Sequence, residues 1–161
     1  MGKKLVLATT SIPRKQAFNE LQIPYEAVGS NAEENFKGRP TEPKSLVLVL
    51  SKLKAEAVAK KRPNSIIIGF DSVGYFNGNI LKKPKSKQEA YKRLQCFSGN
   101  SYEFLTGIRL IDGNYSESKV VKTKVWMREL NKKEIMKYLN QDSNFKRYAQ
   151  GFDPLNTFGI F

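Results

Sequence analysis

Strand-like and helix-like segments alternate along this chain, and this alternation constrains its fold more than any other feature. Short apolar runs, such as 4–8 and the β-branched run 65–71, alternate with segments whose apolar residues recur at helical spacing. The longest of these helical segments is 44–61. Such alternation is typical of α/β domains. The sequence therefore predicts one α/β domain with a mixed sheet and flanking helices.

Local signals place the remaining elements. Ser86 with Glu89 forms a capping box for a helix, and 77–79 (Asn-Gly-Asn) is a hairpin turn signal. We expect further helices over 13–21 and 131–140, and further strands over 25–28, 72–76, 80–82, 102–111 and 115–127. On the longest helix, the stripe expected to face the core consists of Leu46, Leu50, Leu53 and Ala57. Asp71 is expected at a strand end, where α/β folds build their sites.

Composition limits the possible chemistry. The 161 residues include 28 Lys and Arg against 15 Asp and Glu, and the net charge of +13 suits nucleic acid, an anionic membrane surface or nucleotide phosphates as partners. The chain has no His and one Cys, which excludes Ser-His-Asp catalysis, His-based zinc sites and an internal disulfide. No segment has the length of a membrane span or a secretory leader, so we expect a cytoplasmic protein without a membrane partner.

Ser11, Arg14 and Lys15 stand together at the start of the first expected helix. A hydroxyl and two cations at a helix N-terminus, where free N–H groups and the dipole favour anions, can cradle a phosphate. An N-cap with solvated basic residues is the other interpretation of the same three residues.

Carboxylates stand at two further positions. Asp71 follows a buried strand and is suited to bind a hard cation through oxygen, or to cap a turn. Lys82 and Lys83 close the following hairpin, which we expect to bring a cation close to Asp71. Glu33 and Glu34 lie in a polar loop, either as a solvated pair or as part of a site.

Taken together and in this order, these segments resemble the Maf family of nucleotide pyrophosphatases, in the inosine-triphosphatase-like superfamily. Residues 7–15 (LATTSIPRK) are similar to the family's L-A-S-x-S-P-x-R-R opening, and 68–73 (IGFDSV) to its I-G-x-D-x-V strand. Residues 78–84 match G-x-x-x-x-K-P, and Ser98-Gly99 with Thr106-Gly107 match the S-G and T-G pair. The resemblance extends from Leu5 to about Tyr148.

The resemblance implies a mixed twisted sheet with a deep active-site cleft. It also implies hydrolysis of a standard or modified nucleoside triphosphate to monophosphate and pyrophosphate, a reaction that removes unwanted nucleotides from the cellular pools. It implies that the triphosphate is held by Ser11, Arg14, Lys15, Lys54, Lys83 and Gln150. Glu34 and Asp71 would bind Mg²⁺ or Mn²⁺, and Asp71 would also accept a proton from the attacking water; Lys83 and Glu34 would share in catalysis. A homodimer is common in the family.

The chain also departs from the family pattern. Pro13 lies two residues after Ser11 instead of one, Lys15 replaces the second arginine, and Gly74 stands at a usually apolar strand position. Residues 1–161 are expected to form a single domain that lacks the family's C-terminal strand and helix. Ser98-Gly99-Asn100 and 129–138 favour the branch that acts on 7-methyl-GTP over the branch that acts on dTTP and UTP.

Two other functions remain open at this stage. A basic nucleic-acid-binding module would explain the net charge of +13 and the aromatic residues interleaved with lysines over 102–126. Such a module has no use for Asp71 and Glu34, so we expect nucleic acid not to be the partner. A Maf-like protein that binds nucleotides but has lost activity is the third hypothesis.

Overall fold

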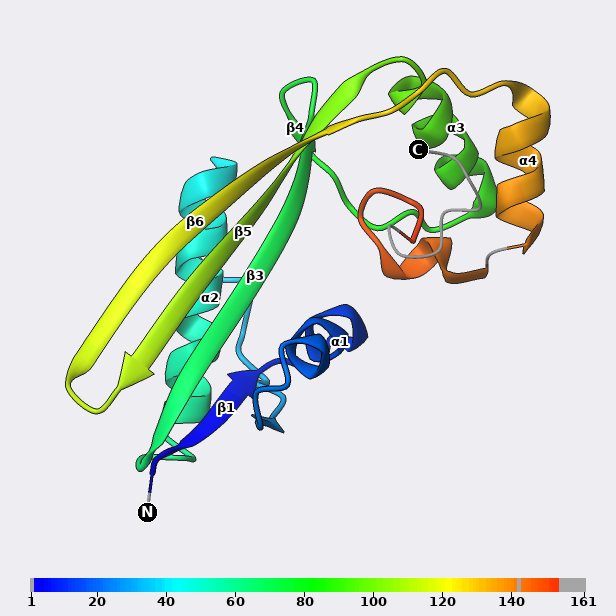
Figure 1. Cartoon of the computed structure of the whole chain (residues 1–161). Helices are drawn as coiled ribbons and strands as arrows, with labels where there is room; N and C mark the ends of the chain where they lie inside the picture. The colour runs from blue at the N-terminus through cyan, green and yellow to red at the C-terminus, as the bar shows by residue number, and fades with distance from the viewer. Residues whose placement is uncertain (1, 142, 154–161) are drawn as a thin grey trace. The chain divides into compact units, whose positions relative to one another are not determined.

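The computed structural model describes residues 2–141 and 143–153. Within them the chain forms strands and helices in the order β1 (Lys4–Ala8), α1 (Ile12–Glu20), β2 (Glu26–Ala27), α2 (Pro43–Ala59), β3 (Ser65–Phe76), β4 (Asn79–Ile80), α3 (Lys87–Phe97), β5 (Ser101–Asp112), β6 (Tyr115–Trp126), α4 (Lys132–Gln141) and the 3₁₀ helix η1 (Ser143–Arg147). Figure 1 shows these elements along the chain. None of the described helices is both long and apolar enough to cross a membrane.

The strands form one mixed sheet in the order β2-β1-β3-β5-β6, with β4 paired to β3. The pairs of β1 with β2 and with β3 are parallel, whereas β4 runs antiparallel to β3. The hairpin between β3 and β4 turns at Asn77 and Gly78, both of which have positive φ, as a two-residue turn of this kind requires. The predicted α/β class and mixed sheet are confirmed.

The described chain divides into two compact units, whose boundary falls inside β3, β5 and β6. The first unit comprises residues 2–72 and 105–121, and the second comprises 73–104, 122–141 and 143–153.

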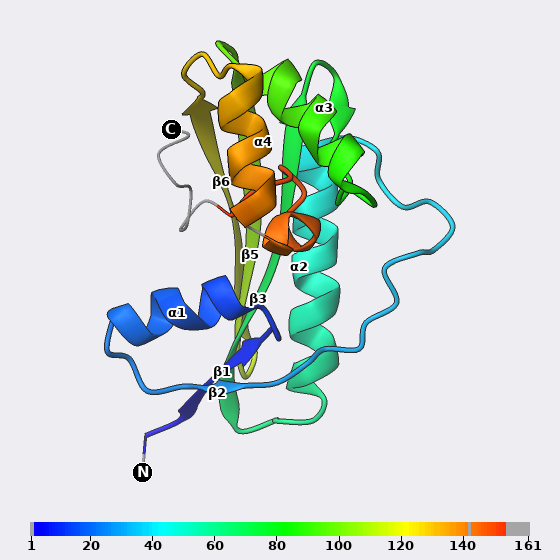
Figure 2. The ribbon, with the colours of Figure 1, turned by 90° about the vertical axis from the view of Figure 1, so that its right-hand side faces the viewer.

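In the first unit, α2 packs directly on the sheet. A Cβ added to Gly69 of β3 would lie 2.4 Å from the carbonyl oxygen of Ser51, and one added to Gly107 of β5 would lie 2.2 Å from that of Val47. Only glycine allows the helix backbone to approach the strands this closely. Figures 1 and 2 both show α2 running alongside β3 and β5. The adjoining core contains Val6, Ala8, Ala55, Val58 and Ile67.

This contact corrects the stripe predicted for α2. Leu46 and Leu50 are buried as expected, but Leu53 and Ala57 are only partly buried. Their places in the core are taken by Val47, Ser51, Ala55 and Val58. The two glycines draw the face that carries Val47 and Ser51 onto the sheet, and helical periodicity alone does not contain this information.

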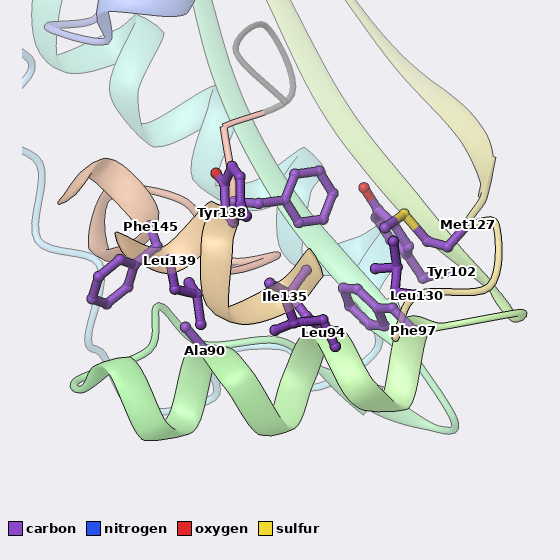
Figure 3. Packing of buried hydrophobic residues seen from close by; sticks show 11 residues of the cluster. Ala90, Leu94, Phe97, Tyr102, Met127, Leu130, Ile135, Tyr138, Leu139 and Phe145 are labelled. Carbon is purple, nitrogen blue, oxygen red and sulfur yellow. The ribbon is translucent and has the colours of Figure 1, made fainter. Parts of the chain in front are cut away.

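The second unit has its own core. Ala90 and Leu94 of α3 pack against Ile135 and Leu139 of α4, and Figure 3 shows these side chains facing one another between the two helices. Phe97 stacks on Tyr102, with ring centroids 4.6 Å apart. Ser86 caps α3 by accepting a hydrogen bond from the Glu89 amide at 3.1 Å, which confirms the predicted helix start.

The structure also corrects the predicted position of Asp71. This residue lies inside β3 and not at its end, because the strand continues to Phe76. The residues that follow Asp71 include Val73, Tyr75 and Phe76, which favour extended backbone, and pairing with β4 holds them in the sheet.

Candidate active site

The edge of β3 next to Asp71 lies free of the neighbouring strand β1. The parallel pairing of β1 with β3 runs from Lys4 opposite Ser65 to Ala8 opposite Gly69, where β1 ends. Asp71 therefore lies just beyond the carboxyl end of its parallel neighbour, although β3 itself continues. In α/β folds this is the place where the loops that follow strands bring functional groups together.

Alternate residues of β3 point to opposite faces of the sheet. Gly69 and Asp71 face α2, since Gly69 contacts its backbone and Asp71 bonds to its Lys54. Phe70 and Ser72 face α1, where Phe70 contacts the ring of Phe18 with centroids 6.0 Å apart. The close approach of α2 at Gly69 thus determines which helix residue reaches Asp71.

Lys54 joins the two predicted metal ligands. Its Nζ lies 2.6 Å from Oδ1 of Asp71 and 2.9 Å from Oε1 of Glu34. The side chains of Lys54 and Asp71 are 15% and 11% exposed, whereas that of Glu34 is 47% exposed. Glu34 therefore reaches the buried pair from the solvent side, out of the loop between β2 and α2.

Burial dominates the electrostatics of Asp71. It raises the pKa of this carboxyl above its ordinary value, and the neighbouring Glu34 carboxylate raises the pKa further. The charges of Lys54 and Arg14 act in the opposite direction without cancelling the effect of burial. A carboxylate with a raised pKa accepts protons more readily, which is the property needed in a general base.

Arg14 of α1 lies partly buried on the other face of β3. Its Nη2 donates to Oγ of Ser72 at 3.0 Å, and Ser72 in turn shares a hydrogen bond of 3.0 Å with Oγ1 of Thr106 on β5. Longer contacts of 3.4 and 3.5 Å join Nη1 to Thr9 and to the carbonyl oxygen of Phe70. These neutral acceptors aim the guanidinium toward the end of β1.

The guanidinium of Arg14 contacts neutral acceptors. Among the described residues no carboxylate lies within ion-pair distance of it, and burial lowers its pKa, while the more distant charges of Asp71 and Glu34 raise it. A guanidinium remains protonated despite such a shift. A partly buried guanidinium whose hydrogen-bond partners are neutral can readily bind an anion.

Ser11 and Lys15 complete the group at the start of α1. Ser11 is the N-cap residue, its side chain makes no capping hydrogen bond, and its amide donates to Oγ1 of Thr9 at 3.1 Å. Lys15 follows one turn later, half-buried, and its carbonyl oxygen accepts a hydrogen bond from Tyr25. The uncapped first turn of α1 thus presents N–H groups beside two cations.

The two carboxylates, Asp71 and Glu34, suit a divalent cation that takes its remaining ligands from water and substrate. The position of Lys54 shows that Asp71 and Glu34 can hold one cation between them. No cluster of three or more acidic or Cys side chains suited to a metal occurs among the described residues. Mg²⁺ is commonly bound by one or two carboxylates together with water and substrate phosphates, so this pair matches that mode of binding.

The predicted residues Lys83 and Gln150 belong to the second unit. Lys83 is exposed in the loop between β4 and α3, whereas Gln150 is buried, with a side chain only 5% exposed. Arg93 of α3 links their two loops, since its Nη1 donates to the carbonyl oxygens of Lys82 and Ala149. The predicted approach of Lys83 to Asp71 and the predicted deep cleft remain predictions.

Other sequence features have structural roles. Ser98 bonds both the amide and the carbonyl group of Leu130, at 2.7 and 3.2 Å, and so fixes the chain between β6 and α4. Two cavities, of about 330 and 670 Å³, are lined by other residues than Asp71, Lys54 and Arg14. Of the aromatic residues interleaved with lysines over 102–126, Tyr102 lies in the core, whereas Tyr115 and Trp126 are 59% and 69% exposed.

Sequence reasoning assigned no role to Ser72, Thr106 or Arg93. Alternation along β3 could have indicated that Ser72 and Asp71 face opposite sides, but only the fold brings Thr106 to Ser72. The sequence pattern around Arg93 does not indicate its contacts, because a basic residue on an amphipathic helix ordinarily faces water.

Known proteins resemble this chain over nearly its full length. The family model described as Maf-like protein matches residues 4–153. The dTTP/UTP pyrophosphatase of Geobacillus sp. is 36% identical over 137 residues, which cover 85% of this chain and 73% of that protein. The 7-methyl-GTP pyrophosphatase of Pseudoalteromonas translucida is 34% identical over 163 residues, which cover 100% of this chain and 75% of that protein.

Solved structures resemble it more weakly. The structure of the Staphylococcus aureus Ham1 protein gives a TM-score of 0.47 at 24% identity, covering 76% of this chain and 70% of that one. Protein VC0702 from Vibrio cholerae gives 0.41 at 10% identity, covering 89% and 72%.

Proposed function

The chain belongs to the family of Maf-like proteins, and from this premise we propose that it is a nucleotide pyrophosphatase that hydrolyses a nucleoside triphosphate to the monophosphate and pyrophosphate. Its relatives are named as pyrophosphatases of dTTP and UTP or of 7-methyl-GTP. The observation that carries the proposal is the contact of Lys54 with both Glu34 and Asp71, next to the helix start that holds Arg14. Carboxylates that can bind a metal thus lie beside cations that can bind phosphate.

Phosphate binding falls to the start of α1 and to the lysines. Ser11 with its uncapped turn, Arg14, whose hydrogen bond to Ser72 leaves its charge available, and Lys15 would hold phosphate oxygens. Once the nucleotide is bound, the ammonium group of Lys54 would also donate hydrogen bonds to phosphate oxygens. Lys83 and Gln150, which belong to the second unit, stay proposed nucleotide-binding residues.

Asp71 is the proposed general base. Water attacks the α-phosphorus, the bond from that phosphorus to the oxygen bridging to the β-phosphorus breaks, and the water proton passes to Asp71. Burial raises the pKa of Asp71, which supports this role. Arg14 and Lys83 would stabilise the negative charge that develops on the α-phosphate and on the leaving pyrophosphate.

Glu34 and Asp71 are the residues that would hold Mg²⁺ or Mn²⁺. Either ion supplies Lewis-acid stabilisation of charge on the phosphate oxygens when bound. The side chain of Glu34 is 47% exposed, which supports its role as the metal ligand on the solvent side. The burial of Asp71 supports its role next to the reacting phosphate.

The proposal extends to the preferred nucleotide, the location in the cell and the oligomeric state. The relatives' names divide between dTTP/UTP and 7-methyl-GTP at 36% and 34% identity, so similarity does not separate the branches; we retain 7-methyl-GTP as the substrate to test first. We further propose that the enzyme acts in the cytoplasm, where nucleotide pools are found, and that it forms a homodimer.

The test is pyrophosphate release from 7-methyl-GTP, dTTP, UTP and the standard nucleotides, with Mg²⁺ or Mn²⁺. Glu34→Gln provides the test of the metal ligand, and Glu33→Gln is its matched control, since the exposed Glu33 only accepts its loop's Asn35 amide. We expect hydrolysis of one nucleotide class, its loss in Glu34→Gln and its retention in Glu33→Gln. Nucleotide binding without hydrolysis would instead identify an inactive family member, and metal-independent, salt-sensitive oligonucleotide binding would identify a nucleic-acid-binding module.

A further inference from the structure

One side chain in the second unit connects the two loops that carry Lys83 and Gln150. Nη1 of Arg93 donates to the carbonyl oxygen of Lys82 and to that of Ala149. These are the carbonyl groups of the peptide bonds that lead into Lys83 and into Gln150. Two acceptors of one nitrogen lie no more than about 6 Å apart, twice an ordinary hydrogen-bond length. Residues far apart in the sequence are thereby held at a fixed spacing.

Packing at the same point reinforces this link. Gly151, next to Gln150, has φ of +83°, and a Cβ placed on it would lie 3.6 Å from Cδ of Arg93 and 3.7 Å from Pro84. The segment that carries Gln150 therefore rests on the stem of Arg93 and on the proline that follows Lys83. The guanidinium and the aliphatic part of one side chain both take part in the contact.

The environment of Arg93 is that of a residue that holds two loops together and not that of a solvated surface residue. Burial is the main cause that lowers its pKa, whereas the neighbouring Glu89 raises it. Lys92, the adjacent residue on α3, is exposed. A planar guanidinium offers several N–H groups in fixed directions, so it can serve two carbonyl oxygens at once.

We propose that Arg93 is a positioning residue, which sets the spacing between Lys83 and Gln150 and so prepares both for the nucleotide. The inference rests on the proposed function for the roles of these two residues, and it adds a residue to which that function assigns no part. Arg93 itself touches neither substrate nor reacting atoms. Its loss affects nucleotide binding through the two loops and leaves the chemistry at Asp71 intact.

The first measurement is independent of activity. Hydrogen exchange is compared between Arg93→Met and Lys92→Met, which remove the same charge from neighbouring positions of α3. We expect the segments around 82–85 and 148–152 to lose protection together in Arg93→Met and to be unchanged in Lys92→Met, with the core of α3 and α4 protected in both. Unchanged exchange in both segments overturns the proposal, whatever the enzyme's activity.

The second measurement is kinetic. In Arg93→Met we expect KM for the nucleotide to rise about tenfold with kcat within about threefold, in Arg93→Lys a partial recovery, and in Lys92→Met wild-type values. Combined with Lys83→Met, Arg93→Met is expected to add little to the effect of Lys83→Met alone, since residues that act through one another are not additive. Wild-type kinetics in a folded Arg93→Met, or fully multiplied effects in the double variant, contradict the proposal.

The two proposals can fail separately. An inactive wild-type protein refutes the proposed function, and hydrogen exchange still decides whether Arg93 holds the two loops. An active enzyme in which Lys83→Met changes KM but Arg93→Met does not supports the proposed function and refutes the positioning role.

Discussion

Lys54 donates a hydrogen bond of 2.6 Å to Asp71 across the contact between α2 and β3. The same ammonium lies 2.9 Å from Glu34. Its single positive charge thereby offsets the repulsion between two carboxylates. A divalent cation that binds these carboxylates has to compete with Lys54 for the same oxygens.

This competition predicts that Lys54→Met binds Mn²⁺ more tightly than the wild type in the absence of nucleotide. Removing the internal cation frees both carboxylates and abolishes its repulsion of the metal, so we expect an affinity gain on the order of tenfold. Counting free Mn²⁺ by electron paramagnetic resonance measures it. Lys52→Met is the control, because Lys52 is exposed and only approaches Glu56, at 3.9 Å. Equal Mn²⁺ affinity in Lys54→Met and the wild type would show that Lys54 does not occupy the metal's place.

Asp71→Asn is predicted to reduce kcat by about 10²- to 10⁴-fold, the usual contribution of a general base, and further if metal binding is lost. The acidic limb of the wild-type pH–rate profile should reflect the ionisation of Asp71, because only its deprotonated form can accept the water proton. Steady-state rates between pH 4 and pH 9 test this. An identical acidic limb in the residual activity of Asp71→Asn would assign the base to another group.

The deprotonated form of Asp71, which is needed for activity, lowers the stability of the fold. A folded-state pKa above the unfolded value means that Asp71 favours folding below its unfolded pKa, and that this contribution is lost as the pH rises through the folded pKa. Without metal, Asp71→Asn should therefore gain stability relative to the wild type as the pH rises from about 4. Urea unfolding in the presence of a chelator measures the difference. A relative gain by the wild type over this pH range contradicts the dominance of burial.

Gly69→Ala is predicted to destabilise the protein by about 1–3 kcal/mol, as overpacking of a well-packed core does. The added Cβ would lie 2.4 Å from the Ser51 carbonyl oxygen, which belongs to helix backbone and can move aside only if α2 shifts. Displacement of α2 should also separate Lys54 from Asp71 and reduce activity in the fraction that folds. Gly2→Ala is the control, since nothing lies within 4 Å of its Cβ. An unchanged unfolding midpoint for Gly69→Ala would contradict the close helix contact.

Ser72→Ala is predicted to lower kcat/KM about fivefold, since one hydrogen bond to Arg14 is worth about 1 kcal/mol. Ser72→Thr keeps the hydroxyl and should retain most activity. Rates for the two variants, measured beside their melting temperatures, separate an effect on Arg14 from a loss of folding. Equal rates in Ser72→Ala and the wild type would mean that Arg14 is oriented without Ser72.

Much of the local structure followed from the sequence. The β-branched run ending at Ile68, the capping box at Ser86 and the turn at Asn77-Gly78 each depend on interactions within a few residues, so they were predicted correctly. Charge and residue type selected Ser11, Arg14, Glu34 and Asp71 as candidates, and the resemblance to the family added Lys54.

The sequence by itself determined the alternation of elements, the mixed α/β class and the candidate groups of the site. Only the tertiary structure decided that α2 turns its Val47 and Ser51 face to two glycines, that Lys54 consequently meets Asp71, and that β3 continues beyond the end of β1. It also joined Thr106 to Ser72 and Arg93 to two distant loops. The physical reason is one of range. Periodicity and propensity depend on interactions within a few residues, whereas these contacts depend on how closely two backbones can approach each other. At Gly69 the absence of a Cβ is what permits the close approach.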